Sequence, residues 1–411
     1  MKPSGLNAAN SALLLLMFGH FTNDMLSGVL PMLYPTMKAH FELDNAQIGL
    51  ATLAYTTAAS LTQPVFGYCS DRFAQRWFAP ATLVWGGFFV SVYGFANSYV
   101  QFLSIAALAG IGSGAFHPLG AANAAAITPD RVRNSALSFY TVGGSVGFAL
   151  GPLVAVALLA WFGPKGTIVL ILPALAAATL IFSRMRGVEA ARNKQTLDRD
   201  LVEGITPEPA QWRHLGKVMG VVMLRSWVFL SVLQYVPVLY DDLGFRPAFY
   251  GAVATAIILG GAAGTLIGGA LADRVGQRLV IVGSMVLVIP SLLLFAGFPG
   301  AWAIATGMLF GLLCDASLSV TLVTAQRLMP GRVGMASGLI LGLGFVTGGI
   351  GVPITGLLAD ALGFRFALMA LTLLAGVSAL IGLTLPDRER ARLNAQPDRP
   401  NTSAESIGIV E

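Results

Sequence analysis

The stretch GYCSDRFAQR, residues 67–76, decides the fold of this chain, because the sequence contains it twice. The second copy, GALADRVGQR, occupies residues 269–278, a shift of 269 − 67 = 202 positions in a chain of 411. Each copy ends a long apolar segment, and another apolar segment follows. Small, acidic and basic residues in this order predict a tight turn between two membrane helices. The residues of the predicted turn are Gly67, Asp71, Arg72 and Arg76, repeated as Gly269, Asp273, Arg274 and Arg278.

The composition indicates a chain that lies in lipid. Of its residues 55% are hydrophobic and 11% are charged, and the mean hydropathy is +0.73. A soluble domain carries about 25% charged residues, so water cannot be the solvent for most of this surface. The two cysteines, Cys69 and Cys314, lie in different halves and provide neither a disulfide framework nor a metal site. We therefore expect no metal and no cofactor.

Twelve segments are long enough to cross about 30 Å of hydrocarbon as helices. In the first half they cover residues 11–37, 46–69, 77–97, 99–122, 134–161 and 165–185. In the second half they cover residues 217–241, 247–272, 278–297, 300–327, 333–361 and 364–384. The sequence therefore predicts an all-α membrane protein with twelve transmembrane helices.

A charged stretch separates the two sets of helices. We predict two pseudo-symmetric six-helix bundles, residues 1–185 and 217–386, joined by a cytoplasmic linker, 186–216, and followed by a cytoplasmic tail, 387–411. The sequence PDRV at 129–132 recurs as PGRV at 330–333, which strengthens the evidence for an internal repeat. In such repeats the substrate site lies between the halves, near the middle of the membrane.

The basic residues lie mostly on one side of the predicted membrane. With the helices threaded in this way, 20 of the 25 Lys and Arg residues are cytoplasmic, four are external and one is intramembrane. This asymmetry follows the positive-inside rule and places both termini in the cytoplasm. It also accounts for the pI near 9.4 without a nucleic-acid partner.

The first predicted helix carries ionisable residues near mid-span, in the run GHFTND at residues 19–24. His20, Asn23 and Asp24 share one helix face, since Asn23 and Asp24 follow His20 by three and four positions. A charge that faces lipid there costs several kcal/mol, so this face points into the bundle or into a water-filled cavity. Two interpretations stay open: a proton-binding pair on a transport path, or a hydrogen-bond cluster that only fixes packing.

The fourth predicted helix contains GIGSGAFHP at residues 110–118. Pro118 cannot donate to the carbonyl of Gly114, so a kink is predicted beside His117. His117 either carries protons or contacts substrate, or it is a neutral histidine satisfied by a neighbour.

The fifth predicted helix has a stripe of small residues at four-residue spacing, which allows another helix to approach closely. The stripe consists of Gly143, Gly147, Gly151 and Pro152.

Two ionisable residues stand out in the second half. Arg225 lies about a third of the way into the seventh helix, and it either contacts substrate or snorkels to the interface near Lys217. Asp315 lies near the middle of the tenth helix, so it is functional or paired, with Arg225 or His117 as the candidate partner. Gln234 and Tyr235, further along the seventh helix, are candidate substrate contacts.

Several of these runs resemble known transporters. The repeated decapeptide resembles the signature of the major facilitator superfamily, and the glycine stripe resembles the antiport motif of its drug:proton antiporters. The runs at residues 19–25, 30–35, 63–68 and 116–118 resemble the fosmidomycin resistance protein family of bacterial exporters. The resemblance implies the major facilitator fold and a proton-driven, inner-membrane exporter of small drugs, with anionic phosphonates among them.

Two positions depart from these patterns. Leu119 stands where the family has an acidic residue, and Leu108 stands where drug:proton antiporters have an arginine. The usual coupling residue is therefore missing, and whether His117 replaces it stays open.

We expect a proton-coupled secondary transporter that exports small drugs or amphipathic or anionic compounds by alternating access. Its expected partners are protons, membrane lipid and a small-molecule substrate, and we expect a monomer. The proton-coupling candidates are His20, Asp24, His117 and Asp315, and the substrate-binding candidates are Asn23, His117, Arg225, Gln234 and Tyr235. The nearest alternative is an uptake carrier for a small metabolite. An intramembrane enzyme would need a nucleophile–base pair or metal-ligand spacing, and a non-transporting scaffold would not explain ionisable groups in both halves.

The threading predicts that residue 195 is cytoplasmic. In a variant without Cys69 and Cys314, a cysteine placed at position 195 should react with an impermeant thiol reagent only after cells are opened. Labelling of intact cells would reverse the predicted orientation.

Overall fold

The computed structural model describes residues 5–73, 77–128, 133–183, 211–329 and 333–386, and in these ranges it contains helices and no strand. The first half contains α1 (Gly5–Ser27), η1 (Leu30–Leu33), α2 (Tyr34–Phe41), α3 (Asn45–Phe73), α4 (Phe78–Ser91), η2 (Tyr93–Phe95), α5 (Tyr99–Ala126), α6 (Arg133–Phe162) and η4 (Pro164–Leu170), followed by helical residues 171–183. The second half contains α8 (Trp212–Asp242), α9 (Pro247–Val275), α10 (Gln277–Gly297), α11 (Ala303–Asp315), α12 (Leu318–Leu328), α13 (Val333–Leu362) and α14 (Phe364–Leu383).

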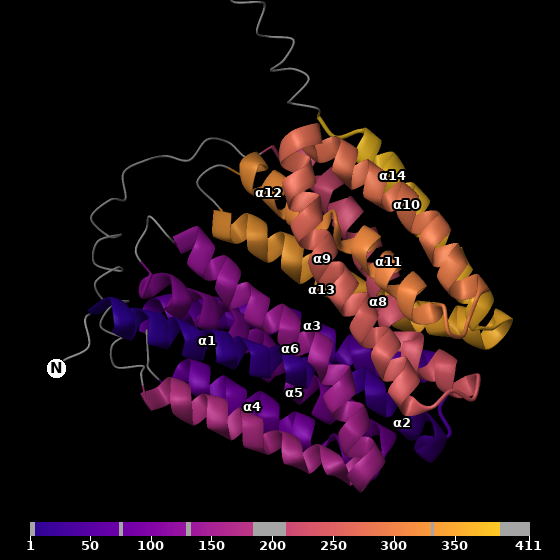
Figure 1. Ribbon diagram of the computed structural model, residues 1–411, viewed down its shortest axis with the longest axis horizontal. Helices are drawn as coiled ribbons and strands as arrows, with labels where there is room; N and C mark the ends of the chain where they lie inside the picture. Colours follow the sequence, from indigo (N-terminus) through magenta and orange to yellow (C-terminus); the bar gives the residue numbers. More distant parts are fainter. Residues whose placement is uncertain (1–4, 74–76, 129–132, 184–210, 330–332, 387–411) are drawn as a thin grey trace, which may run out of the picture.

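The helices form two groups that lie side by side (Figure 1). The first-half helices, indigo to magenta, occupy the lower left of the view, and the second-half helices, salmon to yellow, occupy the upper right. Ten segments are long and apolar enough to cross a membrane, and α3 and α4 complete the twelve predicted spans. The prediction of twelve membrane-spanning helices in two groups is thereby confirmed.

Two predicted helices are interrupted. The first span, predicted as residues 11–37, changes after Ser27 into the short turn η1, where Pro31 has no N–H to donate to a continuous helix. The tenth span, predicted as residues 300–327, divides into α11 and α12 directly after Asp315. Interrupted helices at membrane depth are tolerated where protein or water surrounds the backbone, so both breaks point away from lipid.

The repeated decapeptide is mostly helix, because the helix before each turn extends beyond its predicted end at residue 69 or 272. Gly67 lies inside α3, which continues to Phe73, and Gly269 lies inside α9, which continues to Val275. In the second copy the reversal takes a single residue, Gly276, with φ of 96°. This left-handed value suits glycine, and it explains why an Asp–Arg pair can stay helical up to the turn.

The charged side chains of the second copy are described by the structure, and those of the first copy are not. Asp273 and Arg274 are exposed and Arg278 is half-buried. The side chains of Asp71 and Arg72, and all of Arg76, lie outside the described residues. The predicted linker and tail also fall mainly outside them, except that α8 begins at Trp212, within the stretch predicted as linker.

The start of α3 is capped twice. One cap is a capping box, in which the Gln47 backbone N–H donates to Asp44 Oδ1 at 2.6 Å and the Asp44 backbone N–H donates to Gln47 Oε1 at 2.9 Å. The second cap comes from the other half of the protein. The Asp360 carboxylate, near the end of α13, accepts from the backbone N–H groups of Asn45 and Ala46, each at 3.0 Å.

A buried tyrosine completes this contact between the halves. The Tyr235 hydroxyl on α8 lies 2.7 Å from the Asn45 carbonyl oxygen and 2.9 Å from the Val352 carbonyl oxygen. We call Asn45, Ala46, Tyr235 and Asp360 the latch. The Tyr235 hydroxyl is buried and already bonded, so it links the two halves in this structure, and its assignment to substrate binding stays a prediction.

Further contacts hold the halves together near the latch. Lys38 and Asp242 form an exposed ion pair at 3.1 Å, and the Thr255 hydroxyl on α9 donates to the Ala149 carbonyl on α6 at 2.7 Å. A side chain at Gly49 would collide with Pro353, so α3 and α13 touch through their backbones. The halves are closed against each other at the face where α3 begins and α13 ends.

Asp360→Asn should weaken this closure. An amide can accept at one oxygen only, and its NH2 group would face the second backbone N–H, so about one cap is lost. Loss of a cap costs ~1 kcal/mol, or about fivefold in the ratio of closed to open molecules. Spin labels can be placed at Asn97→Cys and Ala361→Cys, which are both exposed positions near this face. In the variant, a larger fraction of molecules should show a long distance between the two labels.

The matched control is Asp242→Asn, which removes an exposed ion pair between the same two halves. Exposed pairs contribute roughly 0–1 kcal/mol, so this variant should shift the distances less. Equal shifts in the two variants, or none in Asp360→Asn, would contradict the role given to the latch.

Candidate functional site

The site begins with a histidine and an aspartate one turn apart on α1. His20 Nε2 lies 3.2 Å from Asp24 Oδ2, and both side chains are largely buried, with 9% and 18% of their surface exposed. His20 Nδ1 lies 3.0 Å from the backbone carbonyl oxygen of Tyr140 on α6. The Tyr140 ring stacks on the imidazole with its centroid 4.3 Å away, which holds the ring plane in place.

This geometry requires one proton between His20 and Asp24. A carbonyl oxygen only accepts, so His20 Nδ1 must carry a hydrogen toward Tyr140. At 3.2 Å, the Nε2 lone pair and a carboxylate oxygen would repel each other unless a proton lay between them. The pair is therefore either an imidazolium with a carboxylate or a neutral imidazole with a carboxylic acid. In both forms it stores one proton that it can lose only by rearranging.

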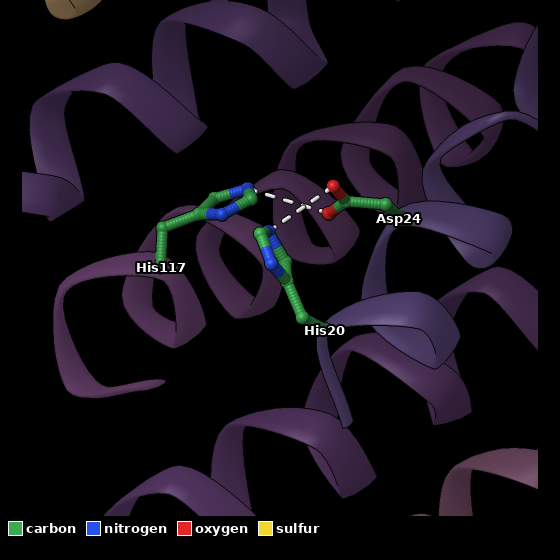
Figure 2. Close-up of side chains that lie close together, drawn as sticks. All are labelled: His20, Asp24 and His117. Atoms are coloured by element: carbon green, nitrogen blue, oxygen red, sulfur yellow. Dashed lines mark ion pairs between the residues drawn. The ribbon is translucent and has the colours of Figure 1, made fainter. Parts of the chain in front are cut away.

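His117 on α5 reaches the same carboxyl group from beside His20 (Figure 2). Its Nε2 lies 3.6 Å from Asp24 Oδ1, and its ring meets the His20 ring edge-on with centroids 5.3 Å apart. Its side chain is 34% exposed, more than those of His20 and Asp24. The structure thus brings together three of the four predicted proton-coupling residues, and His117 is the one most open to its surroundings.

Asn23 donates a hydrogen bond to the Asp24 carboxyl group. It is 4% exposed, and its Nδ2 donates to Asp24 Oδ1 at 2.9 Å and toward Ser113 Oγ at 3.4 Å. Both amide hydrogens are engaged, so Asn23 is a hydrogen-bond partner of Asp24 in this structure, and its assignment to substrate binding stays a prediction.

The glycine stripe of α6 is the surface against which α1 packs. Side chains at Gly147 and Gly151 would collide with the carbonyl oxygens of Phe21 and Met25, so the two backbones are in contact. Gly144, which the sequence analysis did not single out, lies against the His20–Asp24 pair itself. Its signal was present in the sequence, because it directly follows the first glycine of the stripe.

The second half contains a buried ion pair. An Arg225 Nη1 hydrogen is donated to Asp315 Oδ1, and an Nη2 hydrogen is donated to Ser226 Oγ at 3.1 Å. Arg225 is 6% exposed and Asp315 is 9% exposed. Of the alternatives left open, the structure therefore contains the Arg225–Asp315 pair, and Arg225 does not snorkel to the interface. Its Nε has no partner among the described residues.

The two charged sites occupy related positions in the repeat. Asp24 and Arg225 are 225 − 24 = 201 positions apart, and His117 and Asp315 are 315 − 117 = 198 apart, close to the repeat of 202. The first half has its acid on the first span and a base on the fourth, and the second half has the reverse. Since guanidinium does not lose its proton, only the first-half site can change its charge through the basic partner.

The remaining candidate, Gln234, lies on α8 away from these pairs. It is 8% exposed, and its Oε1 has no partner among the described residues. Its assignment to substrate stays a prediction. The ligand atoms of His20, Asp24 and His117 lie within 4.8 Å of one another, a spacing that a metal ion could bridge, although hydrogen bonding already accounts for it.

Twelve spans in two related halves, each with a charged pair inside the membrane, define a polytopic membrane transporter. The family model described as Major Facilitator Superfamily matches residues 16–246 and again 218–409, and the chain belongs to this superfamily. Its members carry small-molecule substrates across membranes and are not enzymes.

Three comparisons place the chain within the superfamily. It is 30% identical over 344 residues to the Fosmidomycin resistance protein of Escherichia coli (strain K12), which covers 83% of this chain and 84% of that one. It is 26% identical over 338 residues to the 3-(3-hydroxy-phenyl)propionate transporter of the same organism, covering 76% and 81%. A bacterial homolog of the human lysosomal transporter Spinster, solved in an inward-facing and unoccupied conformation, superposes with a TM-score of 0.78 at 15% identity and covers 97% of this chain and 100% of that one. The last likeness concerns the fold alone.

Gly144→Ala should disturb the proton site without unfolding the protein. The added methyl would lie 2.6 Å from His20 Nε2 and closer still to Asp24 Oδ2, and these side-chain ends can move apart. Transport should fall and its pH dependence should change, while thermal unfolding in detergent stays near that of the unsubstituted protein.

Gly147→Ala is the matched control, because its methyl would meet the Phe21 backbone, which cannot move as easily. Overpacking of this kind costs ~1–3 kcal/mol, so this variant should unfold at a lower temperature. If Gly144→Ala kept the original pH profile, the pair would not depend on its present geometry.

Proposed function

We propose that the protein is a proton-coupled exporter of small drugs or other amphipathic or anionic compounds, working by alternating access. The observation that carries the proposal is the 3.2 Å approach of His20 Nε2 to Asp24 Oδ2 inside a membrane-spanning helix, a contact that calls for a proton between them. We further propose that the chain acts as a monomer in the bacterial inner membrane, surrounded by lipid, with both termini cytoplasmic.

His117 supports this role for the pair. Its imidazole faces the second oxygen of Asp24 and is 34% exposed, so it can pass a proton between the pair and its surroundings. In a low-dielectric site a carboxyl group with two imidazole neighbours changes its charge when any one of the three groups gains or loses a proton. Such a group can respond to a substrate that arrives or leaves nearby.

Arg225 supports an anionic or partly anionic substrate. Its guanidinium has an unpartnered Nε and is balanced by Asp315. A phosphonate or carboxylate group could take the place of Asp315 and bind the guanidinium through two oxygens, since guanidinium matches such oxygens well. We therefore assign Arg225 to substrate binding and Asp315 to the exchange of counter-ion, and Gln234 stays a further candidate contact.

The names of the two sequence relatives favour different directions. One relative is a drug resistance protein, which supports export, and the other is a transporter of an aromatic acid, which supports uptake of a metabolite. Radiolabel counterflow in proteoliposomes across a compound panel would identify a substrate. An imposed pH gradient would then separate an antiporter, which moves substrate against the proton flow, from a symporter, which moves it with the proton flow.

Asp24→Asn should uncouple transport. The amide keeps the size of the side chain and can still accept from Asn23, but it cannot hold the proton. The variant should fold and bind substrate, lose uphill transport driven by a pH gradient, and keep exchange of labelled for unlabelled substrate. Counterflow and gradient-driven transport, measured in the same proteoliposomes, would check both expectations.

The matched control is Asp241→Asn, which neutralises an exposed carboxylate at the end of α8. It should leave gradient-driven transport unchanged. Uphill, pH-dependent transport by Asp24→Asn at the original rate would remove Asp24 from the mechanism and make Asp315 the leading candidate.

A further inference from the structure

A chain of hydrogen bonds leads from Asp24 to α3. Asn23 Nδ2 donates to Asp24 Oδ1 at 2.9 Å and toward Ser113 Oγ on α5 at 3.4 Å. Ser113 Oγ lies 3.2 Å from Ser27 Oγ on α1, and the Tyr55 hydroxyl on α3 donates to Ser27 Oγ at 2.7 Å. We call Asn23, Ser113, Ser27 and Tyr55 the polar relay. It joins three helices to the carboxyl group that holds the proton.

The hydrogens of the polar relay have one consistent assignment. The Ser27 hydroxyl donates to the Asn23 carbonyl oxygen at 3.0 Å, so its only hydrogen is used. Ser113 must then supply the hydrogen of its bond with Ser27. The side-chain amide of Asn23 supplies the hydrogens of its bonds with Asp24 Oδ1 and with Ser113 Oγ. Every donor in the polar relay therefore has an acceptor as long as Asp24 Oδ1 accepts.

The two oxygens of Asp24 face different groups. Oδ2 faces His20 at 3.2 Å, and Oδ1 faces His117 at 3.6 Å as well as the Asn23 amide. The α6 surface packed against the site adds Gly144 and the uncharged Tyr140 ring. A proton on the Oδ2 side leaves the polar relay intact. A proton on Oδ1, the side that His117 can reach, sets an O–H against the N–H of Asn23.

We propose that the polar relay is a positioning device that ties α3 to the protonation state of Asp24, and this inference rests on the proposed proton site. When Oδ1 is protonated, the Asn23 amide must turn so that its oxygen accepts from Asp24. Ser113 then donates to Asn23 in place of Ser27, and Ser27 turns its hydrogen from the Asn23 carbonyl to Ser113. Ser27 then accepts a hydrogen bond from Tyr55 only, and the backbone carbonyl oxygen of Asn23 loses the hydrogen bond that the Ser27 hydroxyl donated to it.

The rearrangement matters because α3 carries the contacts between the halves. Asn45 and Ala46 of the latch begin this helix, and Thr56, next to Tyr55, leaves no room for a side chain at Gly349 of α13. One neutral hydrogen bond gained or lost changes an equilibrium by about fivefold. Protonation of Asp24 can thus alter how firmly α3 stays closed against α13.

The test follows the distance between the halves as the pH changes. Spin labels at Asn97→Cys and Ala361→Cys, in the full chain with Cys69 and Cys314 replaced by Ser, should show a pH-dependent shift between short and long distances. Tyr55→Phe removes only the hydroxyl, and it should reduce this shift by about fivefold in population ratio. Ser113→Ala interrupts the polar relay at another point and should have the same effect, which keeps the test decisive if one variant expresses poorly.

Tyr34→Phe is the matched control. The buried Tyr34 hydroxyl likewise links α3 to the first predicted span, through Thr52 at 2.6 Å, but it does not join the polar relay. It should leave the pH response unchanged. If Tyr34→Phe reduced the response as much as Tyr55→Phe, general loosening of α3 would explain both, and the proposal would be overturned.

Two further outcomes separate this inference from the proposed function. If Asp24→Asn abolished the pH response but Tyr55→Phe and Ser113→Ala retained it fully, the polar relay would be overturned and the proton site would stand. If Asp24→Asn itself retained the pH response, the proton site would fall, and the polar relay with it.

Discussion

A single proton between His20 and Asp24 is the interaction on which the rest of this structure depends. Hydrocarbon cannot solvate a charge, so both groups must find their partners within the protein. The site meets this demand with neighbours of three kinds. Tyr140 fixes which imidazole nitrogen carries the hydrogen, Asn23 donates to the carboxyl group, and Gly144 leaves the space that both side chains need. The close packing of α6 on α1 follows from the same requirement, because any side chain at Gly144 would enter the site.

At positions related by the repeat, the two halves carry acidic and basic residues in opposite order. Arg225 replaces Asp24 at the repeat spacing, and Asp315 stands close to the position related to His117. A guanidinium keeps its charge, so breaking this pair by removing one partner leaves a buried charge and costs ~3–5 kcal/mol. The first-half site can instead discharge itself by moving a proton. The first-half site can therefore change its charge, whereas the guanidinium of the second half cannot. This combination suits ion-coupled binding of an anion.

Much of this fold could be predicted from local pattern, because apolar length, charge asymmetry and capping residues act within one helix. The twelve spans and the Asp44–Gln47 capping box belong to this group. The latch could not be predicted, since Asp360 caps a helix more than 300 positions away and its sequence neighbours give no sign of this contact. The contact of Tyr235 with the Asn45 carbonyl oxygen could not be predicted for the same reason. The helix breaks after Ser27 and Asp315 could not be predicted either, because an apolar run has the same sequence pattern whether or not the helix is continuous.

The positions of the latch and the proton site follow from what each must do with water. Opening the latch frees two N–H groups of α3 and the carboxylate of Asp360, an exposed residue that water can reach at once. Exchanging a protein hydrogen bond for one with water changes the free energy by only ~1 kcal/mol, so a contact of this kind can open and close readily. The His20–Asp24 pair has no such exchange available, because its side chains are largely buried. It can change only by gaining or losing a proton. A transporter that couples the two needs a strong, slowly altered site in the membrane interior and a weak contact at the water boundary, connected through α3.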